Sequence, residues 1–259
     1  MCKEAMNFVC YIYNNRDNII GGVIASIVFF LLGYIIKKTK QFFVKRNIKK
    51  IFGFNCWDEE YCLVGGKLHA DPRMLTILGK ASYVFTKPGG TTCFTQSYVM
   101  PYSEIIAADY VKMLIMKDLN AKCHLVFDED LREPRSYCSF GGYNNNLSIA
   151  ILHNSKNKFF DVLFGQNGRP FIRNKKEPQK AFSTEQDFDY GVIVKITSDE
   201  GYAQICVVGL GEKGTQGGAY YLSKNYKVLA KKFGEKDFGC VIKVSAHQFS
   251  SVELVDSLA

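Results

Sequence analysis

An uncharged apolar run constrains this chain more than any other feature. Residues 19–36 read IIGGVIASIVFFLLGYII and hold no charged side chain across 18 positions. As an α-helix the run would be about 27 Å long, close to the thickness of a bilayer's hydrocarbon core. A cleavable signal peptide would carry its basic block before the run, whereas here the block follows it and no A-x-A site appears. The run therefore predicts one transmembrane helix at Ile19–Ile36.

The positive charge of the chain is concentrated directly after this run. The net charge is +8, and residues 37–50 hold seven lysines and arginines with no acid. Because basic flanks stay in the cytoplasm, the sequence predicts a single-pass protein of the cell membrane with its C-terminal domain cytoplasmic. The predicted parts are a short extracytoplasmic N-terminus (1–18), the helix (19–36), a basic juxtamembrane segment (37–51) and an α/β domain (52–259).

These charges also limit the partners that the sequence predicts. Membrane lipid would contact the helix 19–36 and the basic segment 37–50, which either lies along the interface or is only a stop-transfer flank. Residues 51–259 carry 24 basic and 23 acidic side chains, so no nucleic acid is expected as a partner. A homo-oligomer through the small residues of the helix is a further hypothesis.

The cysteines and histidines do not follow the spacing of a metal site. The nine cysteines form no C-x-x-C pair, and Cys206 and Cys240 lie in apolar runs, which indicates buried free thiols in a reducing compartment. The four histidines are isolated from one another in the sequence. No metal site and no cofactor are predicted.

The apolar pattern beyond residue 52 is typical of an α/β domain. Short apolar runs that end in glycine alternate with helical spacing over residues 102–119, 145–153 and 217–233. Residues 198–201 (SDEG) and 166–168 (QNG) predict hairpin turns. The order of these elements predicts a three-layer α/β fold with a mostly parallel, Rossmann-like sheet behind the transmembrane helix.

The strongest motif for ligand binding lies between a strand and a helix late in the chain. Residues 209–214 match G-x-G-x-x-G, and the predicted ligand contacts are Gly209, Gly211, Gly214 and Thr215. Glycines let a backbone approach a ligand, and a helix start offers free N–H groups to an anion. The alternative is a tight turn that packs the helix on the sheet.

Three further segments should meet the first at the carboxyl edge of a parallel sheet, where open α/β sheets bind ligands. Gly141 and Gly142 precede Asn144 and Asn146, which either cap a helix or bind a polar ligand. Gly65 and Gly66 end an earlier run. Glu104 begins a helix and is the candidate catalytic carboxylate, although an acid in a first turn also stabilises the helix dipole.

Two of these elements also resemble a known domain. Residues 140–146 form a strand–GG-x-x-x-N–helix element, and residues 207–219 form a strand–G-x-x-x-x-GT–helix element. The pattern resembles an uncharacterised prokaryotic α/β domain, also seen in the C-terminal region of archaeal S-layer proteins. The similarity covers Tyr137–Val244, with Tyr143 where the pattern often has proline. The resemblance implies a three-layer α/β fold and no established reaction.

Three functions are open at this point. The first is a membrane-anchored ligand-sensing or interaction domain that binds a small anionic ligand such as a nucleotide. The second is a membrane-bound enzyme of the TIR or nucleoside-transferase kind, with Glu104 acting on a glycosidic bond. The third is a structural anchor for a partner complex. The sequence favours binding over catalysis.

Overall fold

The computed structural model describes residues 16–53, 60–69, 98–119, 121–131, 134–142, 145–248 and 250–259. The chain divides into two compact units, Met1–Val44 and Lys45–Ala259. Helix α2 (Arg16–Phe52) belongs to both. All of the strands and the helices α4, α5 and α6 belong to the second unit.

The prediction of a transmembrane helix at Ile19–Ile36 is wrong. Of the helices in the described part of the chain, none is long and apolar enough to cross a membrane. Helix α2 continues without a break to Phe52, and its residues 37–50 carry seven lysines and arginines. The predicted single-pass location at the cell membrane is therefore wrong as well. Residues 1–15 of the predicted N-terminal segment lie outside the described residues.

The last turns of α2 are part of the core of the second unit. Ile48, Ile51 and Phe52 are fully buried, and the Phe52 ring lies edge-on to Tyr61 with centroids 5.7 Å apart. The buried Lys195 donates from Nζ to the carbonyl oxygens of Lys50 at 2.6 Å and Glu235 at 3.0 Å. The segment predicted as a basic flank therefore ends as a structural helix of the domain.

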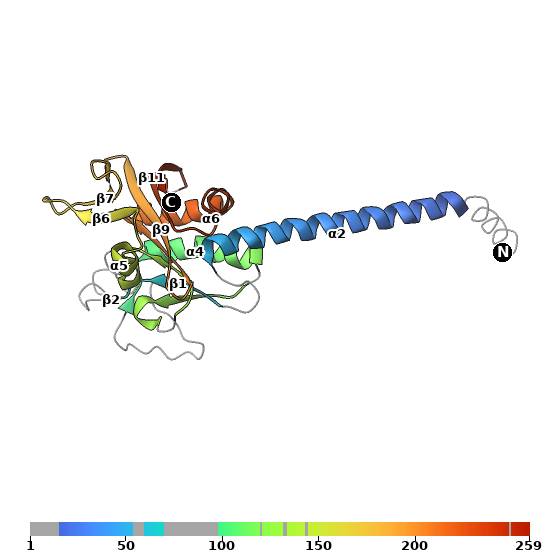
Figure 1. Ribbon diagram of the computed structural model, residues 1–259, viewed down its shortest axis with the longest axis horizontal. Helices are drawn as coiled ribbons and strands as arrows, with labels where there is room; N and C mark the ends of the chain where they lie inside the picture. The colour runs from blue at the N-terminus through green and yellow to red at the C-terminus, as the bar shows by residue number, and fades with distance from the viewer. Residues whose placement is uncertain are drawn as a thin grey trace, which may run out of the picture. The chain divides into compact units, whose positions relative to one another are not determined.

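The main sheet has seven strands in the order β12-β11-β9-β10-β5-β1-β4 (Figure 1). Its strands are β1 (Tyr61–Gly65), β4 (Cys123–Phe127), β5 (Tyr137–Phe140), β9 (Phe188–Thr197), β10 (Ala203–Gly209), β11 (Phe238–Ser245) and β12 (Val252–Leu258). Strands β4, β1, β5 and β10 are parallel. Strand β9 is antiparallel to both β10 and β11, and β12 is antiparallel to β11.

The fold is therefore mixed α/β, and the prediction of a mostly parallel, Rossmann-like sheet is wrong. The physical reason is the position of β9. It forms a tight hairpin with β10, in which Ser198 N donates to Tyr202 O at 2.9 Å and Gly201 has φ +86°. This hairpin at residues 198–201 was predicted and is confirmed. Strand β11 pairs with the free side of β9 and is antiparallel to it, so β11 runs in the same direction as β10.

Helices cover both faces of the sheet. Helices α4 (Tyr102–Leu119) and α6 (Glu212–Phe233) pack against each other, and α6 lies so close to one face that a Cβ added at Gly218 would overlap Val207. On the other face α5 (Asn146–His153) packs on β10, together with a small sheet of β6 (Phe160–Phe164), β7 (Pro170–Asn174) and β8 (Ala181–Ser183). The remaining described elements are β2 (Leu68–His69), β3 (Tyr98–Val99) and the 3-10 helix η1 (Asp128–Asp130).

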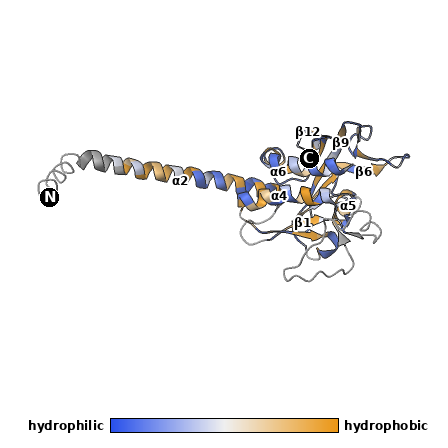
Figure 2. Cartoon of the chain, turned by 180° about the vertical axis from the view of Figure 1, so that it is seen from behind, coloured by the Kyte–Doolittle hydropathy of each residue, from blue (hydrophilic) through white to orange (hydrophobic). Residues whose placement is uncertain are grey.

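Hydropathy along the chain follows this layering. Figure 2 shows hydrophobic colour on strands of the sheet such as β1. Strand β9 is buried over eight consecutive residues, which is expected of a strand covered on both faces. The sheet therefore forms the core, and its loops at the carboxyl ends of β1, β5 and β10 position the candidate site.

Candidate functional site

The loops after β1 and β5 meet around the carboxylate of Glu104. The backbone N–H of Gly66 donates to Glu104 Oε2 at 2.6 Å. Gly141 has φ +81°, and a Cβ added there would overlap Glu104 Oε1. Glycine is therefore required at this position twice, by its backbone conformation and by the close approach of the carboxylate. Gly65, Gly66, Gly141 and Glu104 thus come together, as the sequence predicted for a parallel edge.

Glu104 has the electrostatic properties of a group that exchanges protons near neutral pH. Only 4% of its surface is exposed. Burial raises the pKa of its carboxyl group to about 7, with the Gly66 N–H opposing the shift and Asp128 adding to it. The ionised form is disfavoured because the surrounding protein solvates it less well than water does.

A second buried acid, Asp128, joins the same two loops. Its exposed fraction is 5%. Its Oδ1 accepts a hydrogen bond from Lys67 N at 3.2 Å, and its Oδ2 accepts one from Asn146 N at 2.8 Å. Asp128 is not among the site residues predicted from the sequence. The sequence signal that could have indicated it is its position directly after a strand, at the start of a run of three acids.

Asn145 is the asparagine that organises the loop after β5. It is fully buried, and its Nδ2 donates to Val64 O at 3.1 Å and Phe140 O at 2.9 Å. Its Oδ1 accepts from the N–H groups of Leu147 and Ser148, so it is the N-cap of α5. The prediction had selected its neighbours. Asn144 lies outside the described residues, and the Asn146 side chain is exposed.

The G-x-G-x-x-G loop is closed by a carboxylate of the protein itself. Asp189, at 5% exposure, accepts from Gly211 N at 3.1 Å with Oδ1 and from Gly214 N at 2.6 Å with Oδ2. Its Oδ1 also accepts from Tyr190 N at 2.8 Å and Thr184 Oγ1 at 3.3 Å. Burial raises the pKa of Asp189, and these four donors oppose that shift.

The glycines of this loop serve helix packing. A Cβ added at Gly191 of β9 would overlap the carbonyl oxygen of Gly214, and one added at Gly209 would overlap Thr215 N. Thr215 Oγ1 accepts from Gly209 N at 3.0 Å. The four predicted ligand contacts, Gly209, Gly211, Gly214 and Thr215, therefore lie together. Their contacts are those that the tight-turn alternative requires, and Asp189 occupies the amide groups that an anion would use.

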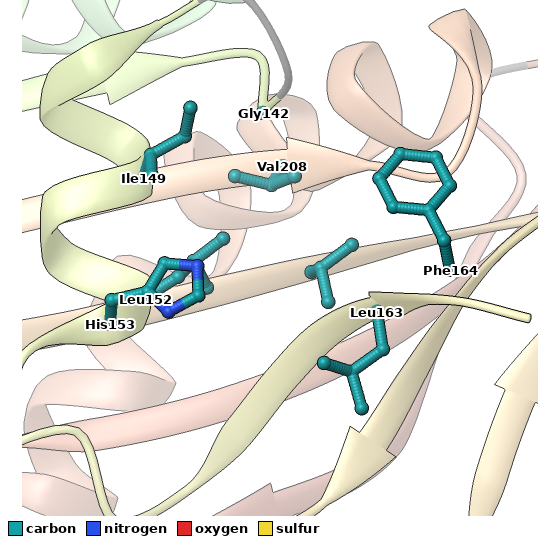
Figure 3. A pocket seen from close by; sticks show the side chains of 8 residues that line it. Gly142, Ile149, Leu152, His153, Leu163, Phe164 and Val208 are labelled. Carbon is teal, nitrogen blue, oxygen red and sulfur yellow. The ribbon is translucent and has the colours of Figure 1, made fainter.

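An open groove lies beside these loops, between α5 and β6 (Figure 3). Its volume is about 490 Å³. Figure 3 shows Phe164 and His153 at opposite ends, with Val208 and Gly142 along one wall. We call this site the α5–β6 groove, lined by Gly142, Ile149, Leu152, His153, Val162, Leu163, Phe164 and Val208. Of the predicted site residues that the structure describes, only Gly142 lines the groove.

Metal chemistry has no evident place among the described residues. They contain no group of three or more histidine, cysteine and acidic side chains that could hold a metal ion. Cys62, Cys123, Cys138, Cys206 and Cys240 are free thiols. Burial raises the pKa of the Cys206 and Cys240 thiols to about 12, which makes both poor nucleophiles.

Comparisons with known protein families, with curated proteins and with solved structures find no match. The resemblance at residues 137–244 therefore stays a prediction.

Proposed function

We propose that the second unit is a ligand-sensing or interaction domain whose binding site is the α5–β6 groove. The observation that carries this proposal is an open groove of about 490 Å³ with a mostly apolar lining. Small-molecule sites in proteins typically have volumes of about 300–1,000 Å³, apolar walls and few polar groups. The groove also adjoins the carboxyl ends of β5 and β10, where the sheet changes from parallel to antiparallel pairing.

The lining indicates the chemistry of the ligand. Phe164 is 60% exposed and offers an aromatic face at one end of the groove. His153, at the other end, offers a ring nitrogen to a polar group. A small organic molecule with a flat apolar body fits this arrangement. The loop amides that could bind a phosphate already donate hydrogen bonds to Asp189, Asp128 and Glu104. A nucleotide-like ligand would therefore bind the groove with its base and not with its phosphate.

The experiment is a thermal-shift screen of the full chain with aromatic heterocycles, nucleosides and nucleotides. A ligand at about 100 times its Kd should stabilise the protein by about 2.7 kcal/mol. The groove variant is Leu163→Gln, and the matched control is Leu125→Gln, a partly exposed strand leucine on β4. We expect the shift to persist in the control and to disappear in Leu163→Gln. A shift that survives in both variants, or no shift with any compound, contradicts the proposal.

A second candidate function is supported by Glu104. A buried carboxyl group with a pKa of about 7 can donate a proton to a leaving group at neutral pH. An enzyme that cleaves a glycosidic bond of a nucleoside would use Glu104 as this acid. Release of free base from a nucleoside and nucleotide panel, followed by chromatography, tests the idea. Turnover should fall in Glu104→Gln and persist in Glu212→Gln, and equal turnover in both would eliminate this function.

A further inference from the structure

The outer surface of α4 and α6 has features that the groove does not explain. The two helices run side by side in the same direction, because two contacts join them in the same order along both. The rings of Tyr110 and Tyr220 lie edge-on with centroids 5.3 Å apart, and Tyr226 donates to Asp118 Oδ2 at 3.1 Å. Their inner sides pack on the sheet, so their outer sides face away from it.

This surface combines exposed apolar and basic side chains. Met113 is 64% exposed, Met116 is 47% exposed and Val228 is 57% exposed. Lys224, Lys227 and Lys231 follow one another at helical spacing and are exposed as well. We call it the α4–α6 face, made of Met113, Met116, Lys117, Lys224, Lys227, Val228 and Lys231.

The lysines of this face concentrate positive charge on it. Within the described part of the chain, none of the four forms an ion pair with a carboxylate. Lys224 and Lys227 lie over the rings of Tyr220 and Tyr226, at 5.7 Å and 5.6 Å from the centroids, which holds them near the helix surface. Residues 222–233 of α6 contain no acid, and Asp109 is the exposed acid on the outer side of α4.

We propose that the α4–α6 face binds an acidic amphipathic helix of a protein partner. The apolar side of such a helix would cover Met113 and Met116, and its carboxylates would pair with Lys117 and with the lysines of α6. Methionine suits this role because its flexible side chain adapts to different apolar surfaces. A phosphate backbone would use the lysines but would leave the two methionines exposed, so the pattern favours a protein partner over a nucleic acid.

The test uses the full chain and a fluorescein-labelled peptide of about 15 residues, long enough for a helix, with leucines on one face and glutamates on the other. Fluorescence anisotropy gives its affinity. The variant Lys227→Glu/Lys231→Glu should weaken binding at least about tenfold. Its matched control is Lys158→Glu/Arg169→Glu, which makes the same charge change at exposed residues elsewhere and should leave the affinity within about twofold.

A second variant separates the apolar contribution from the charge. Met113→Ser/Met116→Ser keeps every lysine and should weaken the peptide at least about fivefold, while unchanged melting temperatures show that the variants remain folded. Four results would overturn the proposal. These are no binding of the acidic peptide, equal weakening by the control pair, equal binding of a peptide with glutamine in place of glutamate, or tighter binding of duplex RNA with the same lysine dependence and no effect of the methionine changes.

Discussion

Removing the Asp189 carboxylate should destabilise the second unit more than any other single change at the loops. Asp189→Ala takes the acceptor away from four donors, of which the amides of Gly211 and Gly214 begin α6. A hydrogen bond to a charged group contributes about 1.5–3 kcal/mol, and such contributions are not additive. Loss of an N-cap alone costs about 1 kcal/mol. We expect a loss of about 4 kcal/mol, which in a domain of this size lowers Tm by about 8–16 °C.

Urea unfolding followed by circular dichroism measures this loss. Asp187→Ala is the control, because Asp187 lies two residues earlier and its side chain is 68% exposed; it should change stability by less than about 0.5 kcal/mol. Inorganic phosphate supplies a further readout. In Asp189→Ala the two α6 amides lack their acceptor, so phosphate should stabilise this variant and leave the parent unchanged. A loss below about 1 kcal/mol in Asp189→Ala would refute the capping role.

Three further changes test the rest of the framework. Burial raises the pKa of Glu104 from 4.5 to about 7 in the folded chain. The free energy of unfolding should therefore fall by up to about 3 kcal/mol as pH rises between these two values. Urea midpoints should show this slope in the parent and not in Glu104→Gln. Asn145→Ala should cost about 3 kcal/mol, since the buried carbonyls of Val64 and Phe140 and the first amides of α5 lose their partner; equal unfolding midpoints would contradict it. Lys195→Ala should lower the free energy of unfolding by about 2 kcal/mol, because it releases the last turn of α2. Lys195→Met should cost less, because methionine fills a similar volume. Calorimetry of the two variants measures this difference.

Local features of the fold could be predicted from sequence because neighbouring residues determine them. The hairpin turn at residues 198–201 and the helix at Tyr102–Leu119 follow from glycine placement and apolar spacing. The pairing of β9 with β11 could not be predicted. A strand that is buried on both faces is apolar throughout, and this pattern is the same whether its neighbours are parallel or antiparallel. The position of β11 beside β9 is a tertiary choice that no local signal records.

The site shows the same division between local and distant information. The glycines at residues 209–214 are visible in the sequence, but the acid that fills their loop comes from the start of β9, more than 20 residues earlier. Asn145 could have been selected over Asn146 only by fixing the helix start to a single residue, which sequence patterns do poorly. The α5–β6 groove depends on a hairpin folding back over α5, which no motif encodes.

The prediction of a transmembrane helix at residues 19–36 was wrong for a comparable reason. The composition of the run shows that the segment is apolar. It does not show that the helix continues to Phe52 and ends inside a protein core. Lys195, far along the chain, provides the donor that fixes this end.

The carboxylate in the loop before α6 has one more consequence. Asp189 is tethered to its site by the backbone of β9, so its local concentration does not fall on dilution and dialysis cannot remove it. A diffusing anion would have to displace a carboxylate that is covalently part of the chain. The loop should consequently keep the same shape at any phosphate concentration, which would make it a fixed support beside the groove.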